Sequence, residues 1–162
     1  LLIILGYSLT KRFTWLCHVI LGLGLSLAPI GAYIAVTGEI NLNIITLGLV
    51  VMFWVAGFDI IYALQDEDFD KSNDLHSIPV LLGKKKGLML SRVFHFLAAL
   101  FLITTIYFLH IENDFINWLS YVGVVIFISM LIYQHTLVKY NDLSKINLAF
   151  FETLGPECWI QL

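Results

Sequence analysis

The feature that most constrains this chain is a series of four long, predominantly apolar runs. They cover residues 13–36, 44–64, 88–110 and 116–138. About 20 residues of helix, at 1.5 Å rise per residue, cross the hydrocarbon core of a bilayer, so runs of this length indicate transmembrane helices. Only 13% of the residues are charged, which is about half the usual share in a soluble domain. The sequence therefore predicts an all-α fold, a polytopic membrane helix bundle.

Two shorter apolar segments stand at the ends of the chain. Residues 1–5 have the character of a helix tail, and residues 146–162 begin a further span but then run into the more polar string GPECWIQL. We therefore expect one membrane domain over residues 1–151, with partial spans at the two ends and an atypical tail at 152–162. Because the chain opens within a helix and without Met, we expect it to be the C-terminal portion of a longer protein, so that the bundle is incomplete.

The charged residues between the apolar runs divide by sign onto two sides. Segments 7–12, 65–87 and 139–145 hold all but one of the nine Lys and Arg residues, whereas 37–43 and 111–115 hold acids and no Lys or Arg. Short loops rich in Lys and Arg stay in the cytoplasm. We therefore predict a multi-pass protein of the cell inner (cytoplasmic) membrane, with the acid-rich loop on the cytoplasmic side. The net charge of −3 is too small to indicate a nucleic-acid partner, so the lipid bilayer is the partner that the composition predicts.

The string DIIYALQDEDFD, at residues 59–70, places acids where the second run leaves the membrane. An unpaired acid inside an apolar run costs about 3 kcal/mol, which makes Asp59 a functional-site hypothesis by default. Asp66 and Asp70 are one helical turn apart, a spacing at which like charges repel. A divalent cation between them would remove that conflict, and carboxylates suit a hard cation such as Mg²⁺. The residues that share one stripe of a continued helix are Asp59, Tyr62, Asp66 and Asp70.

Each of these polar features also has a plainer explanation. The acidic loop fits a solvated helix end, and the lysines at 84–86 fit topology anchors as well as attraction for an anionic substrate or a lipid head group. His18 and His95 fit satisfied polar contacts inside the bundle. A calcium loop is excluded, because its sixth position is Lys71 instead of Gly and its twelfth is Ser77 instead of Glu.

A second small motif lies at the same predicted surface. YSLTK places Tyr7 and Lys11 at i and i+4, hence on one helix face. A lone Tyr–Lys pair is what an aromatic belt and a positive-inside bias produce in any membrane protein. Beside a pair of metal-binding carboxylates, however, it supplies the cation and the hydroxyl donor that a phosphate ligand needs.

These motifs resemble those of a known family. DIIYALQDEDFD, followed by LHSIPVLLG at 75–83, resembles the second aspartate-rich motif of the UbiA superfamily of intramembrane aromatic prenyltransferases. The stretch 7–39 is similar to the segment that precedes it, including the Y-x-x-x-K motif. The likeness runs from about residue 5 to 151 and is closest to the 4-hydroxybenzoate polyprenyltransferase branch. The family's first aspartate-rich motif, of the N-D-x-x-D-x-x-x-D type, is absent from this sequence.

The resemblance implies a bundle of nine transmembrane helices around a cavity that faces the cytoplasm. There, Mg²⁺ held by two aspartate-rich motifs binds the diphosphate of a polyprenyl diphosphate, and the prenyl group passes to an aromatic acid such as 4-hydroxybenzoate in quinone biosynthesis. By the same resemblance, Asp66 and Asp70 match the Mg²⁺-diphosphate aspartates, Tyr7 and Lys11 match the pair near the diphosphate, and Asp59 and Tyr62 line the cavity.

Other functions remain open at this stage. Another branch of the family, acting in haem O, chlorophyll or menaquinone synthesis, would keep the aspartates and change the acceptor. A transporter or channel would explain Asp59 as an ion site but would not require Asp66, Asp70 and the Tyr–Lys pair. Because one aspartate motif is missing, we expect this chain to be inactive alone.

Overall fold

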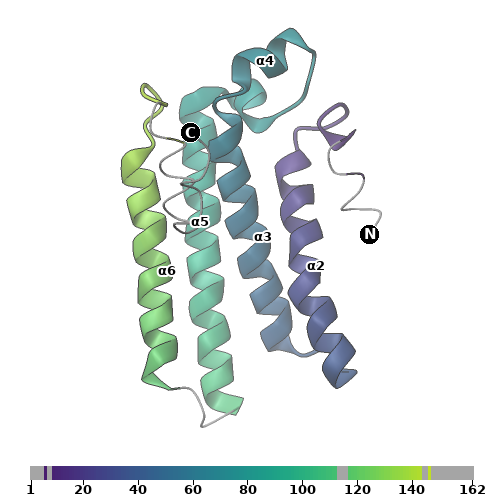
Figure 1. Ribbon diagram of the computed structural model, residues 1–162, viewed down its shortest axis with the longest axis vertical. Coiled ribbons are helices and arrows are strands. Elements are labelled where there is room, and N and C mark those ends of the chain that lie inside the picture. Colours follow the sequence, from purple (N-terminus) through teal and green to yellow (C-terminus); the bar gives the residue numbers. More distant parts are fainter. Residues whose placement is uncertain (1–5, 7–8, 113–116, 144–145, 147–162) are drawn as a thin grey trace, which may run out of the picture.

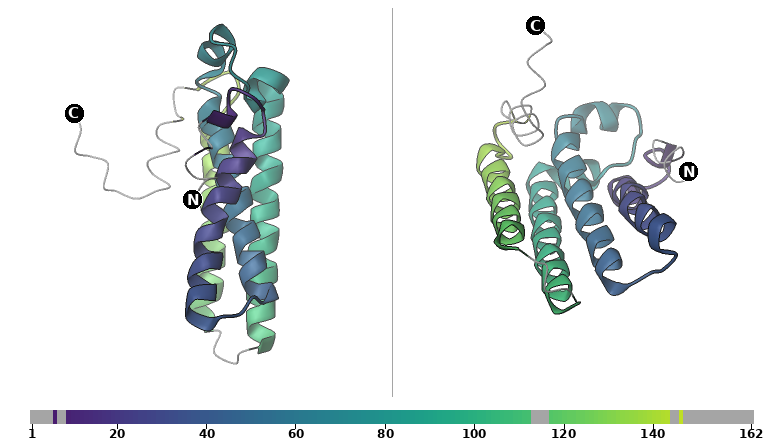
Figure 2. Two further views of the ribbon diagram at one scale, coloured as in Figure 1. Left: turned by 90° about the vertical axis from the view of Figure 1, so that its right-hand side faces the viewer. Right: turned by 60° about the horizontal axis from the view of Figure 1, so that its bottom comes forward.

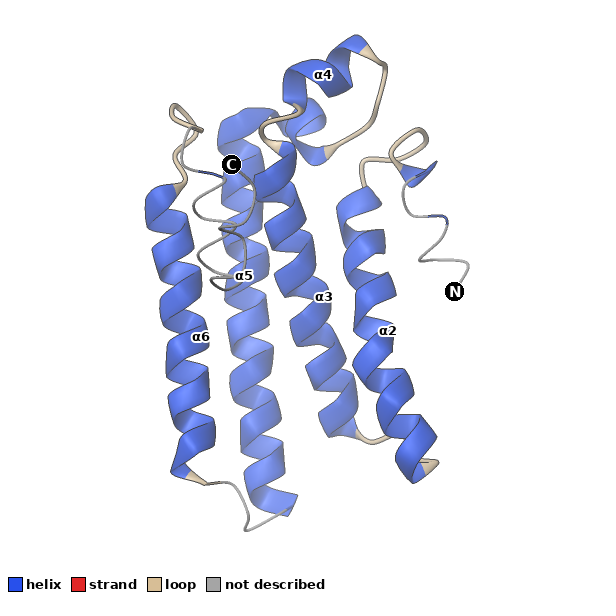
Figure 3. Cartoon of the chain, viewed as in Figure 1, coloured by secondary structure: helices blue, strands red, loops and turns tan. Residues whose placement is uncertain are grey.

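Four helices long and apolar enough to cross a membrane make up most of the described chain. The computed structural model describes residues 6, 9–112, 117–143 and 146. Within them the structure is helical, with a single isolated bridge between Lys139 and Asp142. The predicted all-α membrane fold is confirmed (Figures 1 and 3). The membrane-length helices are α2 (Cys17–Thr37), α3 (Leu42–Ala63), α5 (Ile78–Glu112) and α6 (Trp118–Leu137), and a short helix, α4 (Glu67–Ser72), follows α3.

The long helices lie side by side in the order α2, α3, α5, α6, with α4 across one end of the layer (Figures 1 and 2). Local signals set the reversal between α2 and α3. Gly38 ends α2 in the left-handed conformation (φ 71°) and donates its N–H to the carbonyl of Ile34 at 2.8 Å, a conformation that favours glycine. Asn41 then caps α3, because its side-chain oxygen accepts the N–H of Ile44 at 3.0 Å.

Two helix starts differ from the predicted spans. The first helix begins at Cys17 instead of residue 13, because the chain forms turns up to there, in which Thr10 O accepts the N–H groups of Phe13 and Thr14. The third begins at Ile78 instead of residue 88, with Pro79 in its first turn, where a missing N–H costs nothing. The predicted start lies too late in the sequence because the lysines at 84–86 are polar and interrupt the apolar run. The predicted partial span 1–5 and the tail 152–162 lie outside the described residues.

Helix α5 is a short stub followed by a long rod. Gly83, with φ 78° and ψ 162°, breaks the helical geometry between them. This backbone conformation is open to glycine and strained for residues that carry a side chain. Because of this break, the short stub that follows the acidic loop has a different direction from the long rod.

Helix α3 packs closely against both of its neighbours. At the contact with α2, a methyl group on Gly22 would collide with the carbonyl oxygen of Met52, and at the contact with α5 a methyl on Gly57 would lie 2.5 Å from the ring of His95. The Ser91 hydroxyl donates to the carbonyl of Gly57 at 2.7 Å. Small residues that allow close backbone approach are typical of helix contacts in membranes.

Helix α6 contacts α5 much less extensively than α3 does. One further contact lies at the end of the bundle that carries α4. There, a buried apolar cluster joins the last turn of α3 to the chain that follows α6. Its members are Ile61, Leu64, Leu88, Val138 and Ile146.

Candidate active site

The acidic segment does not continue α3 as one helix. Helix α3 ends at Ala63, and α4 begins at Glu67, so the predicted single stripe through Asp59 and Asp70 is wrong. The last turns of α3 close with short-range bonds, from the N–H of Leu64 to Ile61 O and from the N–H of Gln65 to Tyr62 O. The fully buried Leu64 side chain anchors this corner in the apolar cluster. Asp59 therefore lies on one helix, whereas Asp66 and Asp70 begin and line the next.

Asp70 forms an ion pair with Lys11, although 59 positions separate them in the chain (70 − 11 = 59). Lys11 Nζ lies 2.8 Å from Asp70 Oδ1, and the Asp70 side chain is completely buried, whereas that of Lys11 is 28% exposed. A buried carboxylate requires such a partner, because removing an unpaired charge from water is costly. The structure thus brings together the last aspartate of the acidic segment and the lysine of the Tyr–Lys motif.

Backbone hydrogen bonds fix the chain on both sides of this ion pair. The N–H of Leu75 donates to Asp70 O at 2.9 Å, and the N–H of His76 donates to Lys11 O at 2.7 Å. The loop after α4 is therefore attached to the backbone of the very residue whose side chain reaches Asp70. Lys11 is positioned by its main chain as well as by its charge.

Asp59 is paired with a histidine inside the bundle. His18 Nδ1 lies 2.7 Å from Asp59 Oδ2, and the N–H of Ile78 donates to His18 Nε2 at 3.3 Å. Because Nε2 accepts, Nδ1 carries the hydrogen that reaches the carboxylate. His18 is 2% exposed and Asp59 34% exposed. This partner explains how an acid is accommodated in α3, and it agrees with the prediction that His18 makes a packed polar contact.

The remaining predicted site residues lie around this pair of contacts. Asp66 is half-buried at the N-terminus of α4, and its side chain makes no capping hydrogen bond. Tyr62 lies in the last turn of α3 and is 44% exposed. Tyr7 lies outside the described residues. The structure therefore joins Lys11 to Asp70 directly, places Asp66 one helical turn from Asp70, and holds Asp59 with a different partner.

Glu67 is a buried acid that sequence reasoning did not single out. It accepts a hydrogen bond from Lys71 in the same helix, at i and i+4, and this bond raises the pKa of the Lys71 ammonium above its usual value. The i, i+4 spacing of opposite charges is a signal that would have identified the pair. The pair balances the charge of one of the acids of α4.

The two aspartates of α4 have the chemistry for part of a divalent-cation site. Asp70 Oδ2 is buried and has no hydrogen-bond partner among the described residues, so this oxygen can accept a further ligand. Carboxylate oxygens are ligands that Mg²⁺ accepts, and this ion keeps waters and takes phosphate oxygens for its other positions. Within the described ranges, no group of three or more His, Cys, Asp or Glu residues could hold a metal ion. These residues therefore fit such an ion only as contributors to a site completed by other ligands.

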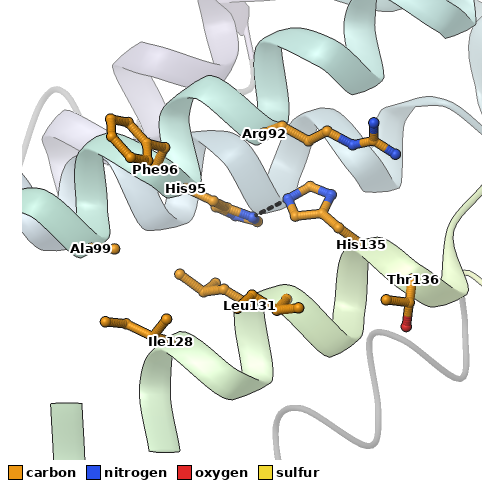
Figure 4. A pocket seen from close by; sticks show the side chains of 9 residues that line it. Arg92, His95, Phe96, Ala99, Ile128, Leu131, His135 and Thr136 are labelled. Atoms are coloured by element: carbon orange, nitrogen blue, oxygen red, sulfur yellow. Dashed lines mark hydrogen bonds between the residues drawn. The ribbon is translucent and has the colours of Figure 1, made fainter. Parts of the chain in front are cut away.

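His95 makes the satisfied contact that the sequence predicted for it. Its Nε2 lies 3.2 Å from Trp54 O in α3, and its Nδ1 lies 2.8 Å from His135 Nε2 in α6 (Figure 4). It thus connects three helices in the middle of the layer. It has no part in the acidic site.

Comparisons with known proteins place this geometry in context. The model of the UbiA prenyltransferase family matches residues 1–154. Two curated relatives are each called 4-hydroxybenzoate octaprenyltransferase. The one from Alcanivorax borkumensis is 30% identical over 136 residues, covering 84% of this chain and 45% of the relative. The one from Francisella tularensis subsp. novicida is 32% identical over 144 residues, covering 89% and 49%.

A solved structure has the same arrangement of helices. It is the apo structure of a UbiA homologue from Aeropyrum pernix K1, with a TM-score of 0.80 and 28% identity, covering 94% of this chain and 57% of that one. The chain spans about half the length of the curated relatives it matches.

Proposed function

The chain belongs to the UbiA prenyltransferase family, and on this premise we propose that it contributes the second aspartate site of an Mg²⁺-dependent aromatic prenyltransferase. The reaction is transfer of a polyprenyl group from a polyprenyl diphosphate to an aromatic acid such as 4-hydroxybenzoate, a step of quinone biosynthesis. The observation that carries the proposal is the contact of Lys11 with Asp70 at 2.8 Å. It unites two motifs that are far apart in the chain at one point of the fold.

This contact has the composition of a diphosphate site. Lys11 supplies a cation that stabilises negative charge as it develops on the leaving diphosphate. Tyr7, one helical turn earlier in the predicted motif, supplies a hydroxyl donor. When Mg²⁺ is bound, it neutralises and orients the diphosphate, and Asp66 and Asp70 are the residues that would hold it. The ion pair with Lys11 gives the buried Asp70 side chain a partner of opposite charge.

Asp59 and Tyr62 act in this proposal as walls of the substrate cavity. Asp59 is fixed by His18, which is itself fixed by the N–H of Ile78. The carboxylate therefore holds its position without a cation. A site with fixed polar groups and apolar surroundings protects an allylic cation from water. We place the site on the cytoplasmic side of the inner membrane, on the strength of the Lys and Arg distribution.

We propose prenyl-transfer activity for a protein of the relatives' full length. The chain spans about half of that length, and its described residues contribute two carboxylates to the proposed metal site. We therefore expect the chain alone to be inactive, and we expect turnover when residues 1–154 replace the matching part of a curated relative.

The two other candidate functions differ in what supports them. A family member with a different aromatic acceptor would use the same Lys11–Asp70 contact, so the acceptor is set by other residues. An ion-coupled transporter was suggested only by an acid within the membrane. That acid, Asp59, has a histidine partner at 2.7 Å, which accounts for it without an ion.

The test is a chimera in which residues 1–154 of this chain replace the matching segment of the Francisella relative. Membranes containing the chimera, supplied with Mg²⁺, octaprenyl diphosphate and radiolabelled 4-hydroxybenzoate, should form labelled prenylated product. Asp66→Ala and Asp70→Ala should each lower the rate by 100-fold or more, on the order of one lost charge-stabilising group. Asp68→Ala is the matched control, since Asp68 is an exposed acid of the same helix, and it should retain the rate.

A binding measurement on the unmodified chain makes the test independent of the chimera's folding. Calorimetric titration of Mg²⁺ in the presence of inorganic pyrophosphate should give heat that disappears in Asp70→Asn and persists in Asp68→Asn. Equal binding by all three proteins would remove Asp70 from the site. Full turnover by the 162-residue chain on its own would contradict the expectation that it is inactive alone.

A further inference from the structure

Several cavities lie along the seam between α5 and α6. Near the end that carries α4, a cavity of about 480 Å³ lies between the start of α5 and the chain after α6, with Lys85 and Lys139 in its wall. A second cavity of about 400 Å³ continues further along the seam, lined by side chains such as Phe96 and Leu131 (Figure 4). Arg92 lines both cavities, which are therefore neighbours, and together they are called the α5–α6 groove.

The groove is charged at one end and apolar along its body. The charged end is lined by Lys85, Lys86, Arg92 and Lys139, and among the residues that the structure describes no acid lines either cavity. Lys85 Nζ also lies 5.8 Å from the ring centroid of Tyr140, which ties α5 to the chain after α6. Past Arg92, the walls are predominantly hydrocarbon. They consist of Phe96, Ala99, Ile128, Leu131 and Ile132, with His95, His135 and Thr136 the polar members.

This pattern matches an amphiphile with an anionic head and a hydrocarbon tail. We propose that the α5–α6 groove binds an anionic phospholipid, with the phosphate among the four cations and an acyl chain along the apolar walls. Four basic side chains attract negative charge, and basic pockets between transmembrane helices bind anionic lipid head groups. The head group would lie at the end of the helices that we place on the cytoplasmic side. The site does not depend on prenyl transfer.

A third cavity extends the path for the tail. Further along the same seam, side chains of α5 and α6 that include Ile106 and Val124 enclose about 240 Å³. The series of cavities therefore continues toward the opposite end of the helices. Lys84, the first of the three consecutive lysines, is half-buried and lines neither of the two cavities of the groove. It provides a control for charge that is near the groove but outside it.

Native mass spectrometry of the purified chain in detergent tests the proposal. The probes are phosphatidylglycerol, phosphatidylcholine of the same acyl composition, and inorganic pyrophosphate as a competitor. Phosphatidylglycerol should remain bound at collision energies that remove phosphatidylcholine. Arg92→Gln and Lys86→Gln should each weaken phosphatidylglycerol binding about fivefold, the effect of one basic residue near an anionic lipid. Lys84→Gln should leave binding unchanged.

Several results would overturn the proposal. Equal retention of the two phospholipids would show unselective annular lipid, and an equal loss in Lys84→Gln and Lys86→Gln would show attraction by overall charge without a site. Displacement of phosphatidylglycerol by equimolar pyrophosphate would assign the cations to a free diphosphate instead. If Arg92→Gln fails to fold, as judged by circular dichroism, the exposed Lys139→Gln, beyond the end of α6, makes the same test.

Discussion

The two faces of α5 are built in opposite ways. Toward α3, the helix carries small and hydroxyl side chains, and its polar groups meet partners in α3, as between Ser91 and Gly57 or Thr105 and Thr46. Toward α6, it meets its neighbour across cavities, and His95 Nδ1 lies 2.8 Å from His135 Nε2 on the facing helix. The comparison teaches that α2, α3 and α5 form a closely packed unit that holds the acidic site, whereas α6 leaves room for other molecules.

Two adjacent alanines in α5 give the largest expected contrast. Ala98 is completely buried, whereas Ala99 lines the groove. Ala98→Leu should lower the free energy of unfolding by about 3 kcal/mol, because a packed interior does not accommodate the added carbons. Ala99→Leu should change it by less than about 0.5 kcal/mol. Thermal unfolding in detergent measures both, and equal losses would show that the two faces are equally packed.

A pair of glycines tests the same contrast with a single methyl group. At Gly57 the added carbon would lie 2.5 Å from the His95 ring and 3.2 Å from Ser91 O, whereas at Gly123 of α6 it meets nothing within 4 Å. Gly57→Ala should lose about 2 kcal/mol, since His95 is held by bonds on both ring nitrogens. Gly123→Ala should be neutral or slightly stabilising. A stable Gly57→Ala variant would mean that the His95 ring moves aside to accommodate the methyl group.

The buried end of α2 carries a smaller expected effect. Asp59→Leu leaves the Nδ1–H of the buried His18 without its acceptor, at a cost of about 1 to 2 kcal/mol. Asp59→Asn keeps an acceptor oxygen and should restore most of the loss. Both variants lack the negative charge, but only Asp59→Leu also lacks the hydrogen-bond acceptor. A difference between their unfolding midpoints therefore measures the hydrogen bond.

The smallest expected effect separates two serines. Ser91 donates between helices to Gly57 O at 2.7 Å, and Ser129 donates within its own helix to Val125 O, also at 2.7 Å. Ser91→Ala should cost about 0.6 kcal/mol, the average for such bonds inside membranes. Ser129→Ala, at an exposed position, should be without measurable effect. A larger loss at Ser129 than at Ser91 would show that the bond between α5 and α3 contributes less than a bond within one exposed helix.

The helices whose bounds depend only on the length of an apolar run could be predicted from the sequence. The run predicted at 44–64 is a helix at Leu42–Ala63, because it is predominantly apolar, with a single charged residue, Asp59. The start of α5 was placed ten residues late (88 − 78 = 10), since three lysines signal a loop although they continue a helix after the break at Gly83. Hydropathy measures the preference of side chains for water or lipid. The ends of a helix are set by backbone hydrogen bonds, which hydropathy does not measure.

Within the site, residue types were predictable and partners were not. The acids and Lys11 stand out by charge in an apolar chain, and the family motif links them. The pairing of Asp59 with His18, across 41 positions, follows from how α2 packs on α3, which no local pattern encodes. The separation of Asp59 from the helix of Asp70 results from the anchoring of Leu64 in the apolar cluster.

The His18–Asp59 hydrogen bond also gives the molecule a signal that nuclear magnetic resonance can follow. A ring proton held between a buried imidazole and a carboxylate is protected from exchange with water, because exchange requires local opening. The other ring nitrogen touches the chain just after the loop that is tied to Lys11. Its nitrogen-15 resonance would therefore report, without any added label near the acids, when a ligand at Lys11 and Asp70 shifts that loop.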